Sequence, residues 1–285
     1  MKQIVLCPNP TRDVGLVYTA AIRNRLMELG ITPTVYPLGY LTEEATEATS
    51  MRCETLDRLI QGADLLLCFG GDGTILHLAR AAALHGVPIL TVNLGTKGFI
   101  AEFEPEALDE IVKTAVSETH LIQERMMLDV AVRRGGQEIY ADFALNDAVI
   151  AGISRLVDIA VFGDGALISR FSGDGIIIAT PTGSTAYSMS AGGPIIEPTA
   201  KNLSVTPICA HALMPKSFVL APERKVSVQI ALGGGKRGYL SVDGGSFDLE
   251  DQDVIYITQS QYVTRLVKAK ERNFYQIINE KLGES

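Results

Sequence analysis

The stretch Ala63-Asp64-Leu65-Leu66-Leu67-Cys68-Phe69 runs directly into Gly70-Gly71-Asp72-Gly73-Thr74. The apolar residues predict a buried strand, and the residues after it predict a helix from Thr74 to His85. Backbone N–H groups at a helix start attract phosphate, and flanking glycines let a ligand approach closely. A carboxylate repels phosphate unless a metal ion screens it or the acid is a reactant, so Asp72 indicates phosphoryl transfer to an alcohol, as metal contact or base. The alternative is an ordinary strand–turn–helix corner in which Asp72 is the N-cap and Thr74 shares that task.

The first hundred residues alternate between strand and helix patterns. The predicted strands are Gln3–Cys7, Thr32–Tyr36, Ala63–Phe69 and Pro88–Asn93, and the predicted helices are Thr11–Leu29, Thr42–Ile60 and Thr74–His85. Such alternation predicts a Rossmann-like α/β domain, whose parallel, doubly wound sheet binds ligands at the carboxyl ends of its strands. Asp72 and the loop Asn93–Phe99 both follow strands of this sheet, so both are expected at its binding edge.

Strand patterns with short turns take over near Gln123. The predicted strands are Leu128–Arg133, Gln137–Leu145, Asp147–Ile150, Leu156–Val161, Ala166–Arg170, Gly175–Ala179, Lys225–Ala231 and Tyr239–Val242. The turns at 134–136, 163–165, 233–235 and 243–245 are rich in glycine, which favours β-hairpins and a C-terminal antiparallel β-sandwich domain. The final helix, Asn273–Leu282, is expected to return to the first domain. We therefore predict two domains, 1–122 with about 268–285, and 123–267.

A second glycine-rich segment spans residues 172–194. Its strand at Ile176–Ala179 leads into a turn rich in hydroxyls and a short helix that opens at Ser184 or Thr185. Hydroxyls and free N–H groups at a helix start suit the phosphates and ribose of a nucleotide, and Tyr187 could stack on a base. The alternative is a capping motif with Tyr187 in the core.

Further polar residues stand in apolar or glycine-rich surroundings. Asn146 and Asp147 lie between two apolar runs, where paired polar side chains are costly unless they have partners. Ribose hydroxyls would be such partners, and so would a simple bulge or turn. Asp174 and Asp243 stand beside glycines, and Asp243-Gly244-Gly245 could be only a type I′ hairpin turn. Several acids around one anionic ligand make sense if they hold its hydroxyls or a metal ion.

Composition limits the class of protein. The chain has 285 residues, 47% hydrophobic and 20% charged, which is an ordinary balance for a soluble globular protein. Its net charge of −8 and the lack of a dense Lys/Arg stripe argue against a nucleic-acid partner. No apolar run approaches the roughly 20 residues that span a bilayer, and the amino-terminal run is too short for a signal peptide. The cysteines and histidines show no metal-ligand spacing, so we expect reduced thiols, a cytoplasmic location and no zinc site.

Several segments match a known family in order and spacing. They are Gly70-Gly71-Asp72-Gly73-Thr74, Asn93-Leu94-Gly95-x-x-Gly98-Phe99, Glu124-Arg125-Met126-Met127-Leu128, Leu145-Asn146-Asp147, Thr180-Pro181-Thr182-Gly183-Ser184-Thr185-Ala186-Tyr187 and Ser190-Ala191-Gly192-Gly193-Pro194. Over nearly the whole chain they resemble the bacterial NAD kinase family. Diacylglycerol kinases, sphingosine kinases and phosphofructokinases carry loops similar to the first segment, whereas the Thr180–Tyr187 segment after Asn146-Asp147 is far more specific.

The resemblance implies transfer of the ATP γ-phosphoryl group to the 2′-hydroxyl of the adenosine ribose of NAD, which makes NADP. It implies that Asp72 is the base that activates this hydroxyl and that Gly73 helps to hold the nucleotide. Asn146 and Asp147 match a pair that contacts the NAD ribose. The other positions that it assigns to substrate or nucleotide binding are His77, Phe99, Arg155, Ser172, Asp174, Thr185, Ala186, Tyr187, Ser188, Met189, Ser190 and Asp243. It also implies Mg²⁺ or another divalent cation with ATP, and a homodimer or homotetramer.

Two alternatives differ from this interpretation. A lipid kinase of the diacylglycerol or sphingosine type shares the first loop, but Thr180–Tyr187 and the lack of a membrane-docking helix or basic patch argue against it. A non-catalytic nucleotide sensor has no need of the base, so the presence of Asp72 argues against a sensor. Departures from the family pattern, such as Lys97 and Cys209-Ala210-His211-Ala212-Leu213, leave open the preferred phosphoryl donor and the choice between NAD and NADH.

Overall fold

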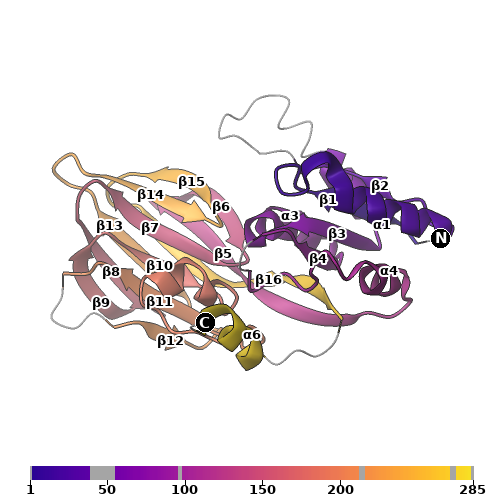
Figure 1. Ribbon diagram of the computed structural model, residues 1–285. Coiled ribbons are helices and arrows are strands. Elements are labelled where there is room, and N and C mark those ends of the chain that lie inside the picture. Colours follow the sequence, from indigo (N-terminus) through magenta and orange to yellow (C-terminus); the bar gives the residue numbers. More distant parts are fainter. Residues whose placement is uncertain (1, 39–54, 96–97, 212–215, 270–273, 284–285) are drawn as a thin grey trace. The chain divides into compact units, whose positions relative to one another are not determined.

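The computed structural model describes residues 2–38, 55–95, 98–211, 216–269 and 274–283. The chain forms two compact units, which are unit 1 (Met1–Glu124 with Thr264–Ser285) and unit 2 (Arg125–Val263) (Figure 1). It passes from one unit to the other twice, each time inside a continuous strand, β5 at Leu121–Arg134 and β16 at Val254–Lys268. The domain bounds stated above, 1–122 with about 268–285 and 123–267, stay a prediction.

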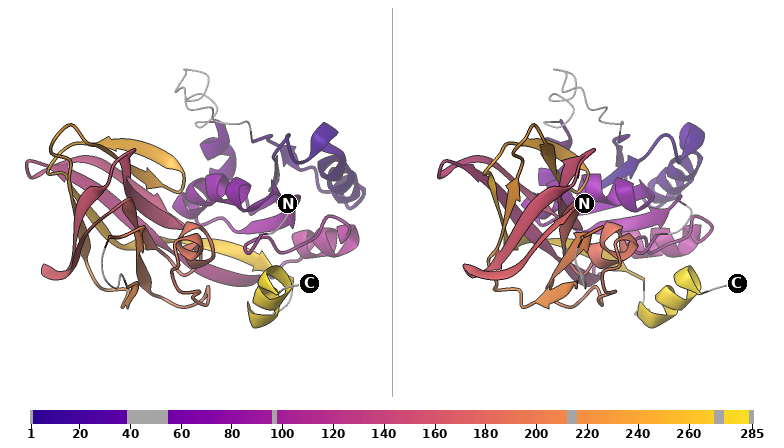
Figure 2. Two further views of the ribbon diagram at one scale, coloured as in Figure 1. Left: turned by 60° about the vertical axis from the view of Figure 1, so that its left-hand side comes forward. Right: turned by 90° about the vertical axis from the view of Figure 1, so that its left-hand side faces the viewer.

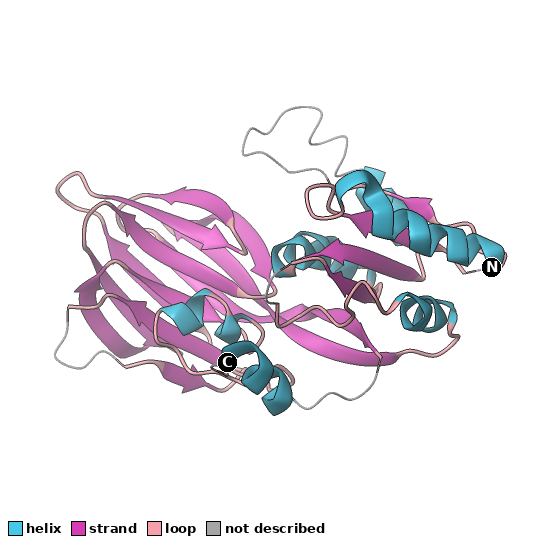
Figure 3. Ribbon diagram, in the orientation of Figure 1, coloured by secondary structure: helices cyan, strands magenta, loops and turns pink. Residues whose placement is uncertain are grey.

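Unit 1 is the α/β part of the chain. Its other elements are β1 (Ile4–Pro8), η1 (Val14–Leu16), α1 (Val17–Glu28), β2 (Thr34–Val35), β3 (Leu65–Gly70), α3 (Asp72–His85), β4 (Ile89–Asn93), α4 (Leu108–Val116) and α6 (Phe274–Leu282). The strands lie in the order β2-β1-β3-β4 and are parallel, as the alternating pattern predicts (Figure 3). Figure 2 shows α1 and α4 on the same side of these strands, where Ile22, Leu67 and Ile111 share one apolar core. The helix α6 belongs to this unit, as expected for a C-terminal helix that returns to it.

The first long helix begins later than predicted. α1 starts at Val17 rather than at Thr11, after a short 3-10 turn. The reason is Asp13, whose buried carboxylate accepts the N–H groups of Tyr18 at 3.1 Å and Thr19 at 2.9 Å. The N–H groups in the first turn of a helix need acceptors, so the residue that supplies them fixes where the helix begins.

The helix after β3 begins earlier than predicted. α3 starts at Asp72 rather than at Thr74, and its N-cap residue is Gly71. Asp72 therefore lies in the first turn and does not cap the helix, contrary to the ordinary-corner interpretation. The predicted helix Thr42–Ile60 lies mostly outside the described residues, and residues 55–61 are helical.

Unit 2 consists mainly of antiparallel strands. Its other elements are β6 (Gln137–Ala144), β7 (Asp147–Ile153), β8 (Val157–Gly163), β9 (Ala166–Gly173), β10 (Gly175–Ala179), η2 (Gly183–Thr185), α5 (Tyr187–Ser190), β11 (Leu203–Ile208), β12 (Phe218–Leu220), β13 (Val226–Ala231), β14 (Arg237–Val242) and β15 (Gly245–Leu249). One sheet has the order β12-β11-β10-β7-β14-β15, and every neighbouring pair in it is antiparallel. A second set pairs β16, β13, β8 and β9 in that order, with β5 and β6 as a further hairpin.

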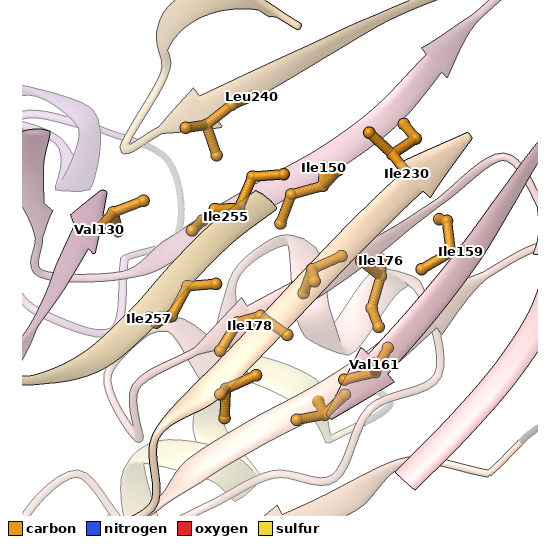
Figure 4. Packing of buried hydrophobic residues seen from close by; sticks show 14 of the residues in the cluster. Val130, Ile150, Ile159, Val161, Ile176, Ile178, Ile230, Leu240, Ile255 and Ile257 are labelled. Atoms are coloured by element: carbon orange, nitrogen blue, oxygen red, sulfur yellow. The ribbon is translucent and has the colours of Figure 1, made fainter. Parts of the chain in front are cut away.

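The two sets of strands enclose one apolar core. Figure 4 shows Ile150 and Ile176 of the six-stranded sheet gathered with Ile159 and Ile255 of the second set. These side chains are fully buried, because alternate residues of each strand point inward. The arrangement confirms the predicted antiparallel β-sandwich.

The predicted glycine turns have the backbone that such hairpins require. At 164–165 and 243–244 two successive residues have positive φ, which are 51° and 82° in the first turn and 46° and 91° in the second. This geometry is that of a type I′ turn, and it explains an aspartate followed by glycine at both places. No helix in the described part of the chain has the length and apolar character needed to cross a membrane.

Candidate active site

The loop between β3 and α3 is closely packed. A Cβ atom at Gly70 would lie 2.3 Å from Thr74 Oγ1, so only glycine fits there. Asn9 Nδ2 donates to the same Oγ1 at 3.0 Å, which ties the end of β1 to the first turn of α3. Gly95 meets Gly71 so closely that an added Cβ on Gly95 would lie 3.2 Å from Gly71 Cα. The glycines thus let the loops after two neighbouring parallel strands touch.

The loop after β4 holds the Asp72 carboxylate. Oδ2 accepts the N–H of Phe99 at 2.8 Å, and Oδ1 accepts the N–H of Ile100 at 3.3 Å. Burial raises the pKa of Asp72, while the N–H groups of Phe99, Ile100 and Ala101 and the charge of Lys281 oppose that rise. A carboxylate with a fixed orientation and a raised pKa is suited to take a proton from a hydroxyl.

The other predicted site residues of unit 1 are Gly73, His77 and Phe99. Gly73 is exposed in the first turn of α3, and nothing lies within 4 Å of the place that a Cβ atom would occupy. His77 is exposed one turn further on, and a spacing of four puts both residues on one side of the helix. Phe99 is half-buried and supplies its N–H to Asp72. Gly73 and Phe99 therefore lie beside Asp72, and His77 lies on the same side of the helix as Gly73.

In unit 2, Asp243 holds the backbone of the Asn146-Asp147 pair. Its carboxylate accepts the N–H groups of Leu145 at 2.6 Å, Asn146 at 2.9 Å and Asp147 at 3.1 Å. Asp243 is also the first positive-φ residue of the turn between β14 and β15. The turn interpretation of Asp243 is thus correct but incomplete, because the same side chain anchors a neighbouring segment.

The segment after β10 contacts the same pair. Thr180 Oγ1 donates to the carbonyl oxygen of Leu145 at 2.6 Å, and the Thr180 N–H donates to that of Asn146 at 2.8 Å. A Cβ atom at Gly183 would lie 2.2 Å from the Asn146 carbonyl oxygen, so glycine is required for this approach. Asn146 is therefore fixed by two segments that are distant in sequence.

Burial gives this pair unusual electrostatics. It raises the pKa of Asp147 from 3.8 to about 7, and the charge of Asp243 adds to the rise. Burial also raises the pKa of Asp243, against the effect of its three N–H donors. Within the described residues, the buried Asn146 Oδ1 receives no hydrogen bond. Buried polar atoms without partners are rare, so this oxygen indicates a place where a polar ligand donates.

The short helix of the second glycine-rich segment begins earlier than predicted. It opens as η2 at Gly183 rather than at Ser184 or Thr185, and Ala186 separates it from α5. Of the residues predicted to bind substrate here, Thr185, Ala186 and Met189 are half-buried, Tyr187 and Ser190 are exposed, and Ser188 is buried.

Most hydroxyls of this segment have partners inside the protein. The buried ones are Thr180 with the Leu145 carbonyl, Thr182 with Arg125 Nη1, Ser184 with the Pro181 carbonyl and Ser188 with Thr206 Oγ1. Thr185 Oγ1 also donates to a carbonyl, that of Thr182, at 3.2 Å. These hydroxyls stabilise the segment itself, so the expectation that they face phosphates stays a prediction.

A cavity of about 470 Å³ lies on the outer face of the six-stranded sheet. Its lining residues are Ala151, Gly152, Ser154, Arg155, Leu156, Asp174, Tyr187, Ile208 and Tyr239. Arg155, Asp174 and Tyr187 are predicted site residues that the fold brings together here. Partial burial raises the pKa of Tyr187, and neighbouring groups that include Asp174 and Asp147 add to the rise. The charge of Asp147, the candidate for ribose contact, therefore acts on Tyr187, which lines the cavity.

Tyr239 and Ser172 are two residues at which the lining of the cavity differs from the predicted site. Ser172 is not a lining residue, and its hydroxyl pairs with Asp158. Tyr239 was missed although its signal is present, because Leu240 and Val242 face the core and the strand alternation turns Tyr239 to the cavity side. Within the described residues, no three His, Cys, Asp or Glu side chains are grouped to hold a metal ion.

Two family models and several curated proteins match this chain, and together the matches cover its whole length. Residues 18–120 match the family described as ATP-NAD kinase N-terminal domain, and residues 145–269 match the ATP-NAD kinase C-terminal domain. The chain is 33% identical to an NAD kinase of Ruminiclostridium cellulolyticum, with 100% of this chain and 99% of that protein covered. It is 36% identical to an NAD kinase of Caldanaerobacter subterraneus subsp. tengcongensis, with 100% of both covered.

Two solved structures share the fold. Yeast NADH kinase in complex with NADH has a TM-score of 0.79 and 24% identity, and the match covers 99% of this chain and 88% of that one. An NAD kinase from Archaeoglobus fulgidus in complex with ATP has a TM-score of 0.75 and 24% identity, with 100% of both chains covered. These likenesses confirm the predicted combination of an α/β part and an antiparallel β part.

Proposed function

The chain belongs to the NAD kinase family, and from this premise we propose how its residues carry out the reaction. The enzyme transfers the γ-phosphoryl group of ATP to the 2′-hydroxyl of the adenosine ribose of NAD, which yields NADP and ADP. Asp72 supplies the base, and other residues of the chain hold NAD. The observation that carries the proposal is the half-buried Asp72 carboxylate, fixed by the N–H groups of Phe99 and Ile100.

Asp72 acts as the general base. As the 2′-oxygen bonds to the γ-phosphorus, the hydroxyl proton passes to an Asp72 oxygen, and the bond from the γ-phosphorus to the bridging oxygen of ADP breaks. Burial supports this role because it raises the pKa of Asp72 and so strengthens it as a base. General-base assistance contributes about 10²–10⁴ in rate, and positioning supplies much of the rest.

The first turn of α3 binds the nucleotide. Gly73 leaves its surroundings open, so a phosphate or ribose can come close to the backbone N–H groups of the helix start. His77 lies on the same side of the helix, and Phe99 lies beside Asp72. These three residues are proposed as nucleotide contacts around the base.

Asn146 and Asp147 hold the ribose of NAD. Asn146 Oδ1, which has no hydrogen-bond partner among the described residues of the protein, accepts a hydrogen bond from a ribose hydroxyl. This bond gives the buried oxygen the donor that it lacks. Asp147 has a pKa of about 7, so near neutral pH its carboxyl group either accepts from or donates to a hydroxyl. Asp243 contributes through the backbone of this pair.

The cavity beside Tyr187 accommodates a flat ring of the dinucleotide. Tyr187 and Tyr239 offer aromatic faces, and Asp174 and Arg155 offer polar groups at the same place. Its volume of about 470 Å³ suits part of a dinucleotide. Ser172, Thr185, Ala186, Ser188, Met189 and Ser190 are proposed as the supporting residues around it.

Three wider features belong to the proposal. Mg²⁺ or another divalent cation enters with ATP, whose phosphate oxygens are the ligands that such ions prefer. The protein acts in the cytoplasm, which is supported by free thiols at Cys7, Cys68 and Cys209. It assembles as a homodimer or homotetramer, which is the assembly that the resemblance to the family implies.

A coupled assay tests the proposal. Purified protein is given Mg²⁺, ATP and NAD, and an NADP-specific dehydrogenase reports NADP. We expect Asp72→Asn to lower turnover about 10²–10⁴-fold while calorimetry shows NAD binding close to that of the wild type. The matched control is Asp109→Asn, an exposed aspartate of unit 1, which keeps full activity.

Three other results of this assay would contradict the proposal or favour an alternative function. Normal turnover in Asp72→Asn removes the base role from Asp72. NAD binding without NADP formation by the wild type, with ATP, other triphosphates or polyphosphate, would favour the nucleotide sensor. Neither binding nor turnover would favour the lipid kinase, although the family match and the retained site residues disfavour both alternatives.

A further inference from the structure

A buried ion pair stands next to the loop that holds Asp72. Glu102 follows directly after the three residues whose N–H groups face Asp72, and its side chain is 2% exposed. Its carboxylate pairs with Lys268, whose side chain is 12% exposed, and accepts the N–H of Ala269 at 3.1 Å. Its own N–H donates to Thr91 Oγ1 at 2.9 Å. Glu102 thus joins the loop after β4 both to β4 and to the end of β16.

The loop is also anchored at its start. The N–H of Leu94 donates to the Gly70 carbonyl at 3.0 Å, and that of Gly95 donates to Asn93 Oδ1 at 3.1 Å. At the other end the N–H of Phe103 donates to a β4 carbonyl, and Glu102 adds the contacts above. The residues between these anchors carry the N–H groups that orient the Asp72 carboxylate.

Stability alone is a weak reason for this ion pair. Taking two charges out of water costs more than burying apolar side chains of similar size, so such pairs often add nothing to the free energy of unfolding. What they do supply is a directional, charge-assisted bond between two fixed points. Here those points are the catalytic loop and the strand β16.

We propose that Glu102 and Lys268 are positioning residues for phosphoryl transfer, because their pairing fixes the loop whose N–H groups orient Asp72. The inference rests on the proposed role of Asp72 as base. It makes Glu102 and Lys268 part of the machinery without contact to substrate. Shifting a base by about 1 Å lowers a rate by as much as about 10²-fold, so a small movement of this loop suffices.

The test uses Glu102→Gln, Lys268→Met and the double variant. Glu102→Gln retains an oxygen for the Ala269 N–H, and the double variant leaves no unpaired buried charge, so it folds even if a single variant does not. The control is Arg25→Met, which breaks the exposed ion pair with Asp109 in the same unit. Two measurements are made, which are steady-state kinetics of NADP formation and amide hydrogen exchange over residues 99–101.

We expect kcat to fall about 10- to 100-fold in the pair variants, with KM for NAD and for ATP within about twofold of the wild type. We expect exchange at residues 99–101 to become at least about tenfold faster, while amides of β1 and α4 keep their wild-type rates. Arg25→Met leaves both measurements unchanged.

Three results overturn the proposal. Unchanged exchange at residues 99–101 shows that the pair does not fix the loop, and equally faster exchange throughout unit 1 shows a general structural role. Faster exchange at the loop with wild-type kcat shows that the pair fixes the loop but does not serve the reaction. Failure of the base role is seen separately as normal turnover in Asp72→Asn, and the exchange result does not depend on it.

Discussion

Asp243 Oδ1 accepts the backbone N–H of Asn146 at 2.9 Å, although the two residues are 97 positions apart in the sequence. The contact is possible because β14 lies beside β7, with Val242 opposite Ala148. The hairpin turn that follows β14 therefore delivers a carboxylate to the start of β7. A turn residue thus determines how the proposed ribose contacts are presented.

Replacing Asp243 should raise KM for NAD more than it lowers kcat. Asp243→Ala removes the acceptor of three N–H groups, which costs about 1–3 kcal/mol, and places alanine at positive φ. Asp243→Asn keeps an oxygen acceptor and tolerates the turn, so its effects should be smaller. Urea denaturation and steady-state kinetics measure both effects.

Asp164 provides the matched control for that experiment. It occupies the corresponding place in the turn between β8 and β9, with φ 51°. Asp164→Ala should destabilise the protein through the same backbone strain yet leave KM for NAD unchanged. An equal rise of KM in both alanine variants would show that the effect comes from loss of stability and not from the Asn146-Asp147 pair.

Stability should depend on pH through Asp147. Its folded pKa of about 7 lies above the unfolded value near 3.8, so the protonated form contributes stability that is fully present below about pH 3.8 and is lost as pH rises through about 7. Asp147→Asn removes this dependence. Relative to the variant, the wild type should lose up to about 1.4 kcal/mol per pH unit inside that window.

Denaturation of wild type and Asp147→Asn at pH 5 and pH 8 measures the difference, with Asp248→Asn as an exposed control. The advantage of the variant should be larger at pH 8. If the two proteins differ by the same amount at both pH values, Asp147 does not have a raised pKa in the folded protein.

The pH profile of turnover should respond to Lys281. A base must be deprotonated to act, so kcat falls as pH drops through the pKa of Asp72, and the raised pKa puts this fall above the range of an ordinary aspartate. The Lys281 charge lowers that pKa. Lys281→Met should therefore move the acid limb of the kcat profile to higher pH, whereas Lys113→Met on α4 should not. A shift in the opposite direction contradicts the assignment of the limb to Asp72.

Two glycines near Asp72 should behave differently when changed to alanine. A Cβ atom at position 98 would lie 2.5 Å from Asp72 Oδ1, so Gly98→Ala displaces the carboxylate and should lower kcat about 10- to 100-fold. Gly73→Ala meets no protein atom within 4 Å and should raise stability by about 0.5–1 kcal/mol. Its KM for ATP or NAD should nevertheless rise, because the methyl group occupies space proposed for the nucleotide. An unchanged KM would place the nucleotide elsewhere.

The strands of unit 2 could be predicted where local signals coincide. β10 is Gly175–Ala179 as predicted, since a run of isoleucines is bounded by glycine and by a turn. β16 was missed, because Thr258-Gln259-Ser260-Gln261 interrupts its apolar pattern and its pairing with distant strands supplies what the local sequence lacks. α4 was missed as well, since it is only nine residues long and its buried face becomes apparent through contact with α1.

The candidate site also contains some residues that local sequence signals identify and others that depend on strand pairing. Asp72 could be identified because its glycine neighbours adjoin it in sequence. The donors to its carboxylate, Phe99 and Ile100, lie 27 and 28 positions away and follow only from the pairing of β3 with β4. Asp243 was interpretable as a turn, but its hold on Asn146 depends on tertiary pairing that no short-range pattern encodes.

The passage of the chain through β5 and β16 also makes both units depend on the last part of the chain to be synthesised. Unit 1 needs residues from 264 onward, and the ribosome makes these only after all of unit 2. Leu266 then pairs with Ile89, and Lys268 reaches Glu102. Domains tend to fold as units while the chain emerges. Unit 2 takes Ile255 and Ile257 of its core from the same strand, β16, so both units reach their final cores only when the end of the chain has been made.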